Sequence, residues 1–162
     1  MAERQVVLNP AFDAVDRRIL ARLQEDGRIT NQALAEAVHL SPAQCNRRHR
    51  RLEEQGYVRR YEARLDAPRL GLGVTAFVHV TMERGHIREV EQFRQRVRDM
   101  AQVQECYAVT GDFDYVLKVV ARDLKALSDF LLGTLAQLPG VNGVRSSVCL
   151  DEIKCISALP LD

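Results

Sequence analysis

The sequence has few cysteines, and their placement excludes two kinds of protein. Only four occur among 162 residues, at Cys45, Cys106, Cys149 and Cys155. They form no CxxC pair, and no set of histidines at metal-ligand spacing accompanies them. We therefore expect no disulfide framework, no metal centre and no cofactor, and we interpret the cysteines as free thiols in a reducing cytosol.

Long apolar runs and catalytic motifs are missing as well. No apolar stretch approaches the ~20 residues that a helix needs to cross a bilayer, and nothing near the N-terminus combines a basic stretch, an apolar run and a cleavage site. The chain has no nucleophile elbow, no P-loop and no glycine-rich dinucleotide turn. The sequence thus predicts a cytoplasmic protein without a membrane partner, which is not an enzyme and has no catalytic or metal-ligating residues.

An excess of charge of one sign is nearly absent, because the formal net charge is only +1. The distribution is less even: residues 1–70 carry 13 basic and 10 acidic side chains, whereas residues 71–162 carry 10 and 12. Seven arginines and three glutamates lie between Arg47 and Arg64. A local positive field of this kind is what a DNA-binding surface requires.

Residues 41–55 predict a capped helix that carries four arginines. Ser41 as N-cap and Gln44 three residues later form a capping box, and Pro42 occupies the first helical position. Gly56 then follows the end of the helix.

The two sides of this helix differ in chemistry. Helical spacing places Cys45, His49 and Leu52 on the buried side. The exposed types can read bases, because arginine forks onto guanine and asparagine or glutamine onto adenine, although capping competes for the Gln44 amide. Arginines near the helix end and in the following segment are suited to phosphates. The predicted DNA-binding residues are Ser41, Ala43, Gln44, Asn46, Arg47, Arg48, Arg50, Arg51, Arg59 and Arg60, and the alternative is a solvated basic face without a partner.

The preceding residues complete a DNA-binding domain. Apolar residues at helical spacing predict a helix from Asp13 to Gly27, and Thr30 caps a second short helix over residues 31–38. A three-residue turn separates the second helix from the arginine-rich one, as in a helix-turn-helix unit. Residues 56–65 are predicted to be extended and to form a small wing. We therefore expect a winged helix-turn-helix domain over residues 1–65.

The apolar pattern changes period after a linker at residues 66–73. Strands are predicted at 74–82, 103–109 and 115–121, an extended segment at 141–156, and helices at 87–97 and 124–135. The order β-α-β-β-α-β is typical of a ferredoxin-like sandwich, in which helices cover one face of an antiparallel sheet. The fold class expected for the whole chain is therefore α+β, with the second domain over residues 74–162.

Short motifs occur in a fixed order along most of the chain. They are DRRIL at 16–20 with QEDGR at 24–28, LSPAQC at 40–45, RLEEQG at 51–56, QEC at 104–106, GDFDY at 111–115 and LPGV at 138–141. Together they resemble the leucine-responsive regulatory protein (Lrp)/AsnC family, and GDFDY and QEC particularly resemble its leucine-responsive branch. The resemblance implies a bacterial or archaeal transcription regulator that dimerises through its second domain, often assembles to octamers or wraps DNA, and takes amino acids as effectors.

The same resemblance implies an effector site at the turn of residues 110–114, at the interface between dimers. Backbone amides near Gly111 can hold a carboxylate, and Asp112 or Asp114 can pair with an ammonium group. The predicted effector-binding residues are Thr110, Gly111, Asp112, Phe113, Asp114 and, from a neighbouring subunit, Ser146. The alternative is a tight hairpin in which glycine and aspartate are favoured for turn geometry alone.

The sequence thus predicts a sequence-specific, nucleoid-associated regulator that binds double-stranded DNA and responds to leucine or another aliphatic amino acid. The first strand of the second domain is apolar on both sides, which leaves one sheet face uncovered by its own helices. A two-fold homodimer would bury that face and present two recognition helices about 34 to 36 Å apart, and the family habit adds octamers. An amino-acid sensor that acts through protein partners without binding DNA is the alternative.

Overall fold

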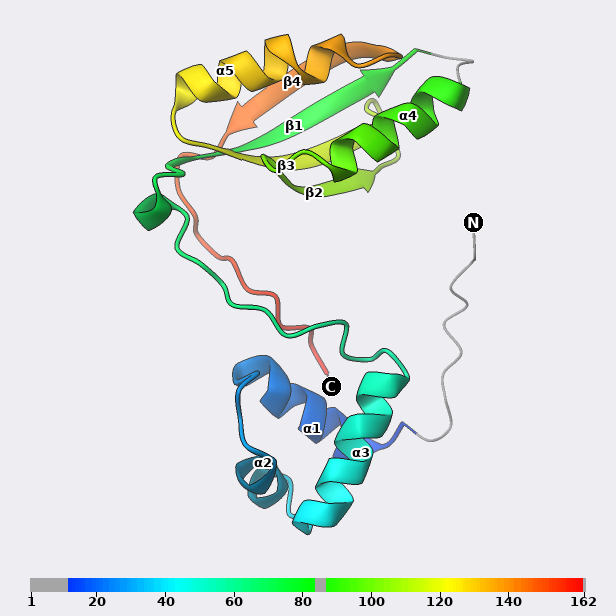
Figure 1. Ribbon diagram of the computed structural model, residues 1–162, viewed down its shortest axis with the longest axis vertical. Coiled ribbons are helices and arrows are strands. Elements are labelled where there is room, and N and C mark those ends of the chain that lie inside the picture. The colour runs from blue at the N-terminus through cyan, green and yellow to red at the C-terminus, as the bar shows by residue number, and fades with distance from the viewer. Residues whose placement is uncertain (1–11, 84–86, 162) are drawn as a thin grey trace. The chain divides into compact units, whose positions relative to one another are not determined.

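The computed structural model describes residues 12–83 and 87–161. These residues divide into two compact units (Figure 1). The first unit runs up to Arg64 and also contains the C-terminal segment from Lys154, and the second unit is Leu65–Ile153. None of the described helices is long and apolar enough to span a membrane.

Three helices form the first unit. They are α1 (Ala14–Glu25), α2 (Asn31–Ala37) and α3 (Pro42–Glu54). The side chains of Asp13, Thr30 and Ser41 each accept a backbone N–H from the first turn of the helix that follows. The caps at Thr30 and Ser41 confirm the prediction. Ile19, Leu34 and Leu52, one from each helix, are fully buried in a shared core.

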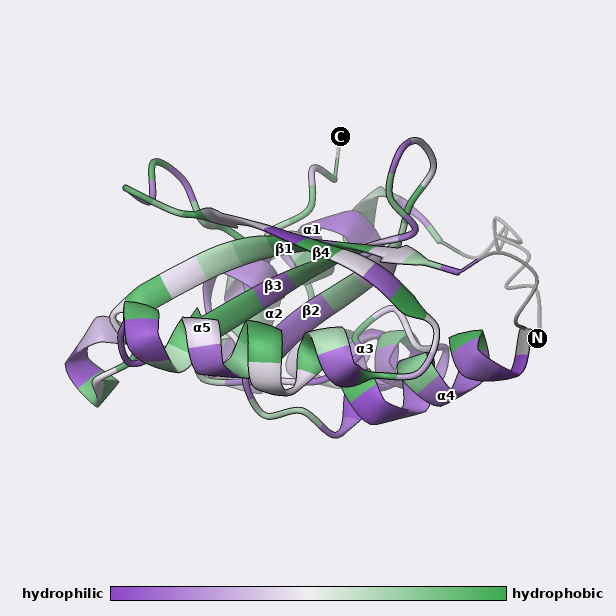
Figure 2. Cartoon of the chain, turned by 90° about the horizontal axis from the view of Figure 1, so that it is seen from above, coloured by the Kyte–Doolittle hydropathy of each residue, from purple (hydrophilic) through white to green (hydrophobic). Residues whose placement is uncertain are grey.

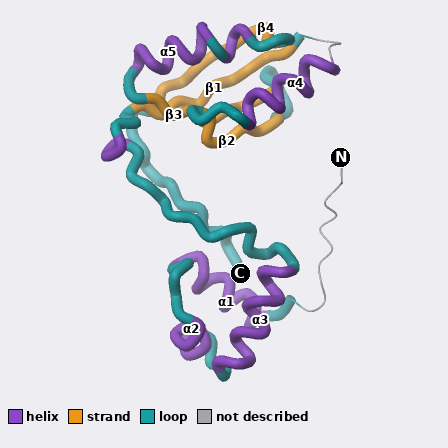
Figure 3. The backbone as a smooth tube through the Cα atoms, viewed as in Figure 1, coloured by secondary structure: helices purple, strands orange, loops and turns teal. Residues whose placement is uncertain are grey.

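The segment after α3 is extended but forms no strand between residues 57 and 66 (Figure 3). A strand needs a regular apolar side that can be buried. Arg59, Arg60, Glu62 and Arg64 are all exposed, so this stretch has no such side. The extended conformation predicted there is present, and strand pairing is not.

The second unit has the predicted element order. Its elements are η1 (Pro68–Leu70), β1 (Val74–Met82), α4 (Ile87–Arg98), β2 (Val103–Ala108), β3 (Tyr115–Ala121), α5 (Leu124–Gly133), η2 (Leu135–Gln137) and β4 (Val141–Val148). The strands form one antiparallel sheet in the order β2-β3-β1-β4. Both α-helices lie on the same side of this sheet (Figure 2). This arrangement confirms the ferredoxin-like prediction.

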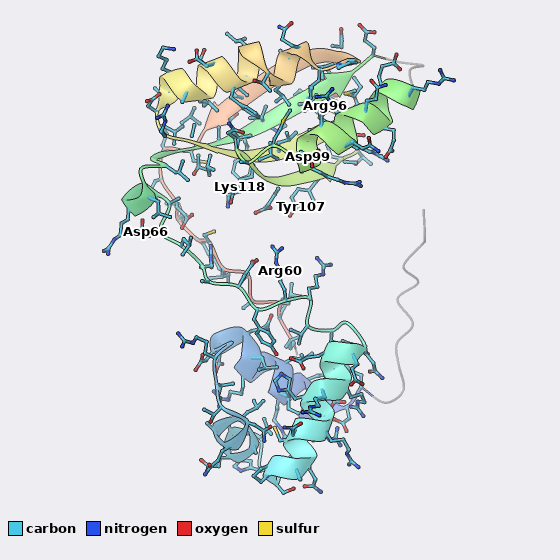
Figure 4. The ribbon with its side chains drawn as sticks, viewed as in Figure 1. Arg60, Asp66, Arg96, Asp99, Tyr107 and Lys118 are labelled. Atoms are coloured by element: carbon cyan, nitrogen blue, oxygen red, sulfur yellow. The ribbon has the colours of Figure 1, made fainter. Side chains whose placement is uncertain are left out.

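The two faces of the sheet differ in burial. Ala76, Val78 and Val80 of β1 are fully buried in one core with residues of α4 and α5. Their neighbour Phe77 is 43% exposed on the other face, where it pairs in register with Lys118 of β3. The side chain of Lys118 lies below the sheet, away from α4 and α5 (Figure 4). The face predicted to be uncovered by the chain's own helices is therefore uncovered.

Strand pairing of β4 ends at Val148, eight residues before the end of the predicted extended segment. The chain then continues without strand structure and joins the first unit from Lys154 onwards. The alternation of apolar residues over 141–156 does not indicate this change of unit.

Candidate functional site

A groove of about 820 Å³ runs along α3. Its lining residues are Asn31, Pro42, Ala43, Asn46, Arg47, Arg48, Arg50, Arg51 and Glu54. The fold thus brings most of the residues predicted to bind DNA to one surface. Asn31, the first residue of α2, was not among them. Its Nδ2 donates to the carbonyl of Pro42 over 3.1 Å, which fixes the start of α3 beside α2.

The outward-facing side of α3 is electropositive. Ala43, Arg47 and Arg50 are exposed, and Asn46 is half-buried. Neither Arg47 nor Arg50 forms an ion pair with any residue that the structure describes. Their charges are therefore available to an anionic partner.

The first turn of α3 is occupied by the predicted capping box. The backbone N–H of Gln44 donates to Ser41 Oγ, and the backbone N–H of Ser41 donates to Gln44 Oε1, both over 3.3 Å. The oxygen of the Gln44 amide is thus engaged, and its NH₂ group is the part that remains for a base.

Arg48 and Arg51 differ from the other two arginines, because they contact carboxylates of α1. Arg48 Nη1 lies 2.8 Å from Asp13 Oδ2 and 2.9 Å from Asp16 Oδ1. Arg51 Nη2 lies 2.5 Å from Asp16 Oδ2. Asp16 is fully buried, and a buried carboxylate requires such compensation. These contacts fasten α3 to α1 and differ from the predicted phosphate contacts.

Asp13 belongs to the same network. Its Oδ1 accepts the backbone N–H groups of Val15 and Asp16, and its own backbone N–H donates to Asp16 Oδ2. The N–H of Asp16 and, next, the Arg48 guanidinium lower the pKa of the Asp13 carboxyl from its ordinary value.

The segment after α3 is held against that helix by a tyrosine. Tyr61 Oη donates to Glu53 Oε1 over 3.0 Å and lies 2.7 Å from His49 Nε2. Burial, followed by the Glu53 contact, raises the pKa of Tyr61 to about 12. His49, predicted on the buried side, is therefore half-buried and hydrogen-bonded.

Arg59 and Arg60 precede this tyrosine and are exposed. Arg60 Nε lies 2.6 Å from Glu62 Oε2, and its side chain projects from the segment (Figure 4). A surface ion pair of this kind is weak and exchanges readily with other partners.

In the second unit, the turn between β2 and β3 is bonded to β1. The backbone N–H of Asp114 donates to the carbonyl of Val80 over 3.0 Å, and the N–H of Met82 donates to Asp114 Oδ2 over 2.7 Å. Gly111 has a φ of 110°, which a side chain would disfavour. One oxygen of Asp114 thus holds the turn in place, and Thr110, Gly111 and Asp112 remain exposed.

Phe113 of this turn packs on the uncovered face of the sheet. Its ring centroid lies 4.7 Å from that of His79, and the Arg145 guanidinium lies 5.5 Å from it. His79 and Arg145 are opposite each other on β1 and β4. Ser146 is paired with the buried Val78 and so belongs to the other face. A single chain does not bring Ser146 to Phe113, and the prediction had placed it in a neighbouring subunit.

Asp16 is the main functional residue that reasoning from the sequence missed. The sequence pattern could have indicated it, because Asp16 shares one face of α1 with the apolar Ile19 and Leu23 at helical spacing. All three are buried in the structure. For His79 and Arg145 no signal existed, because their meeting depends on strand register. Among the residues that the structure describes, no cluster of three or more His, Cys, Asp or Glu could hold a metal ion.

Comparisons with known proteins match both units. Residues 12–59 match a family model described as a winged helix-turn-helix DNA-binding domain, and residues 75–159 match the Lrp/AsnC ligand binding domain. The chain is 44% identical over 143 residues to the leucine-responsive regulatory protein of Escherichia coli, which covers 88% of this chain and 87% of that relative.

Two solved structures agree along nearly the whole chain. One is a transcriptional regulator from Neisseria meningitidis in complex with L-methionine, with a TM-score of 0.90 and 42% identity over 93% of this chain and 97% of that chain. The other is an AsnC family transcriptional regulator from Agrobacterium tumefaciens, with a TM-score of 0.87 and 36% identity over 92% and 97%.

The buried charge of Asp16 generates a stability prediction. Asp16→Asn keeps the size of the side chain but leaves Arg48 and Arg51 without their buried anion, so the free energy of unfolding should fall by about 3 kcal/mol. Glu25→Gln, in the exposed pair with Arg22, is the control and should cost less than about 1 kcal/mol. Urea unfolding followed by helical circular dichroism measures both. Equal losses would contradict the role of Asp16.

The lowered pKa of Asp13 generates a pH prediction. A carboxylate whose pKa is lowered on folding stabilises the fold above its unfolded pKa, and this contribution is lost as the pH falls through the folded pKa. The wild-type unit should therefore lose stability as the pH drops below 3.8, the ordinary value. Asp13→Asn retains an N-cap acceptor and should lose less. Thermal unfolding of both proteins from pH 6 to pH 3 measures the difference, and parallel curves would refute it.

Proposed function

Because the chain belongs to the Lrp/AsnC family of DNA-binding transcription regulators that respond to amino acids, we propose that α3 reads double-stranded DNA through Asn46, Arg47 and Arg50. The observation that carries this proposal is the division among the four arginines of α3. Arg47 and Arg50 face the groove and pair with no carboxylate of the described residues, whereas Arg48 and Arg51 are held by Asp16. The second pair then orients the helix that the first pair uses for recognition.

The remaining predicted residues receive narrower roles. Arg47 and Arg50 fork onto guanine, Asn46 contacts adenine, and Ala43 is suited to a thymine methyl group. Ser41 and Gln44 lie at the capped end, where Gln44 offers its NH₂ group. Arg59 and Arg60 bind phosphates and fix the register of the protein on DNA.

We propose further that the turn at residues 110–114 holds the amino-acid effector. Gly111 permits a close approach of the effector carboxylate to backbone amides, and Asp112 with the second oxygen of Asp114 pairs with its ammonium group. Thr110 borders the site, Phe113 offers an apolar surface for the effector side chain, and Ser146 comes from a neighbouring subunit. Leucine and methionine are the first candidates, because relatives are named for the one and solved with the other.

The uncovered sheet face supports a homodimer as the working unit. Phe77 and Tyr107, 43% and 57% exposed, lie on that face, and burying such side chains favours association. Two-fold pairing would place two copies of α3 about one DNA turn apart, some 34 to 36 Å. We infer a cytoplasmic, nucleoid-associated bacterial or archaeal regulator that assembles to octamers and catalyses no reaction.

Arginine substitutions separate base reading from phosphate binding. On DNA from the gene's own upstream region, Arg47→Ala should reduce the preference for the site over scrambled DNA by about tenfold. Arg59→Ala should weaken binding to the site and to scrambled DNA alike. It should also reduce the magnitude of the slope of log affinity against log salt by about 0.9. Arg69→Ala in the linker is the control, because Arg69 already pairs with Asp66. An unchanged slope for Arg59→Ala would refute the phosphate contact.

Two substitutions of Asp114 separate its bond to Met82 from its charge. Asp114→Asn retains an oxygen for the N–H of Met82, whereas Asp114→Ala loses it and should cost about 1 kcal/mol of stability. Both remove the carboxylate, so in both L-leucine or L-methionine should no longer alter DNA affinity, while affinity without the amino acid persists. Gel-shift titrations with and without each amino acid measure this. A wild-type response in Asp114→Asn would exclude Asp114 from the effector site.

A further inference from the structure

The chain's last residues are bonded to the DNA-binding unit at two points. Arg64 Nη1 donates to the carbonyl of Cys155 over 2.5 Å, and Arg64 Nη2 lies 2.7 Å from Cys155 Sγ. Farther along, the side-chain amide of Gln24 on α1 bonds both backbone groups of Leu159: Gln24 Nε2 donates to its carbonyl over 3.0 Å, and its N–H donates to Gln24 Oε1 over 2.6 Å. We call residues 149–161 the C-terminal tail.

Polar bonds hold this tail more than apolar burial does. Four of its five large apolar side chains, Leu150, Ile153, Ile156 and Leu159, remain 99%, 87%, 64% and 69% exposed, and Leu161 is half-buried. Exposed hydrogen bonds exchange with water at little net cost. A fastened tail and a released tail should therefore be close in free energy, as a switchable element requires.

The tail is also the direct continuation of the strand that contacts the proposed effector turn. Arg145 on β4 lies over the ring of Phe113, and the chain enters the first unit nine residues later, at Lys154. The other chain connection between the units follows Arg64, the residue that bonds Cys155. The bonds between Arg64 and Cys155 therefore join the two segments that connect the units, at the point where both leave the first unit.

The far end of the tail leads to the recognition helix. Gln24 lies on α1, the helix whose Asp16 anchors Arg48 and Arg51 of α3. The chain thus leads from β4, which contacts Phe113, through the tail to α1, and the contacts of Asp16 link α1 to α3. It uses Gln24, part of the QEDGR motif, which the DNA-binding surface does not use.

We propose that the C-terminal tail is the strap through which the effector turn acts on the DNA-binding unit, with Gln24 and Arg64 as its positioning residues. This inference rests on the proposed effector function. An effector that repacks Phe113 against Arg145 has different affinities for the fastened and released forms, and shifts their populations by that difference. Release lengthens the tether of α1 and changes how readily two copies of α3 reach neighbouring half-sites.

The test compares Gln24→Ala with Gln32→Ala in the full-length protein. Gln32 is an exposed glutamine on α2 whose side chain bonds Glu36, and it serves as the matched control. DNA affinity is measured without amino acid, with L-leucine and with L-methionine. The ratio of the DNA affinity with amino acid to the DNA affinity without it is typically about 5- to 150-fold in coupled systems. In Gln24→Ala this ratio should fall to about 1. The DNA affinity of Gln24→Ala, now the same with and without amino acid, should equal one of the two affinities that the wild type shows under these conditions. Gln32→Ala should keep the wild-type ratio.

A second measurement reports on the tail itself. Because the fastened and released forms are close in free energy, the Leu159 amide should undergo hydrogen exchange moderately more slowly in the wild type than in Gln24→Ala, and its rate in the wild type should change when the effective amino acid is added. Arg64→Ala should likewise release the tail. Because coupling is reciprocal, Gln24→Ala should also shift effector affinity in the absence of DNA.

The possible failures are distinguishable. If the wild type responds to an amino acid and Gln24→Ala responds equally, the strap is refuted while the proposed function stands. Equal exchange rates of the Leu159 amide in the wild type and in Gln24→Ala refute the strap without reference to any effector. If wild-type DNA affinity ignores both amino acids, the proposed effector function fails for them, and this inference fails with it.

Discussion

The buried carboxylate of Asp16 constrains the whole DNA-binding surface. A charge removed from water must be matched by cations and N–H donors, and here Arg48, Arg51 and the Asp13 backbone provide them. Since both cations come from α3, satisfying Asp16 also sets the rotation of that helix about its axis. Residues one position away, Arg47 and Arg50, are then directed outwards. The outward direction of the DNA-contacting side chains on one side of α3 thus follows from the need to compensate the Asp16 carboxylate on its other side.

The sequence predicted elements whose causes are local. The capping box at Ser41, the cap at Thr30 and the strand limits of β1 and β3 depend on residues within a few positions of one another, and the structure has them where they were expected. The roles of the four arginines could not be predicted in this way. Arg48 finds Asp13 across 35 positions of the chain, so helix packing decides which arginines are engaged. The same holds for Phe113, whose neighbours His79 and Arg145 meet only through the register of β1 and β4.

Asp114 illustrates why residue type alone does not assign a role. An acidic residue in a glycine-containing turn suits an ammonium ligand and suits turn geometry equally well. The structure shows that one of its oxygens accepts the N–H of Met82, 32 positions earlier. The two interpretations are therefore not exclusive, because a carboxylate has two oxygens and one can fix the turn while the other faces a ligand. A carboxylate oriented in advance by the protein loses less freedom when a ligand arrives.

The bonds of the DNA-binding unit fall into a buried and an exposed class, and regulation requires both. Those of Asp16 lie in the interior, where breaking them leaves an uncompensated charge, so α1 and α3 move together as one body. Those of Gln24 and Arg64 lie at the surface, where water replaces a lost partner. A signal that reaches this unit can therefore alter its attachment without altering the orientation of α3 on α1. The preference for particular bases would then stay constant, while the fraction of molecules whose two copies of α3 can reach neighbouring half-sites changes. A regulator with fixed target sites requires this combination.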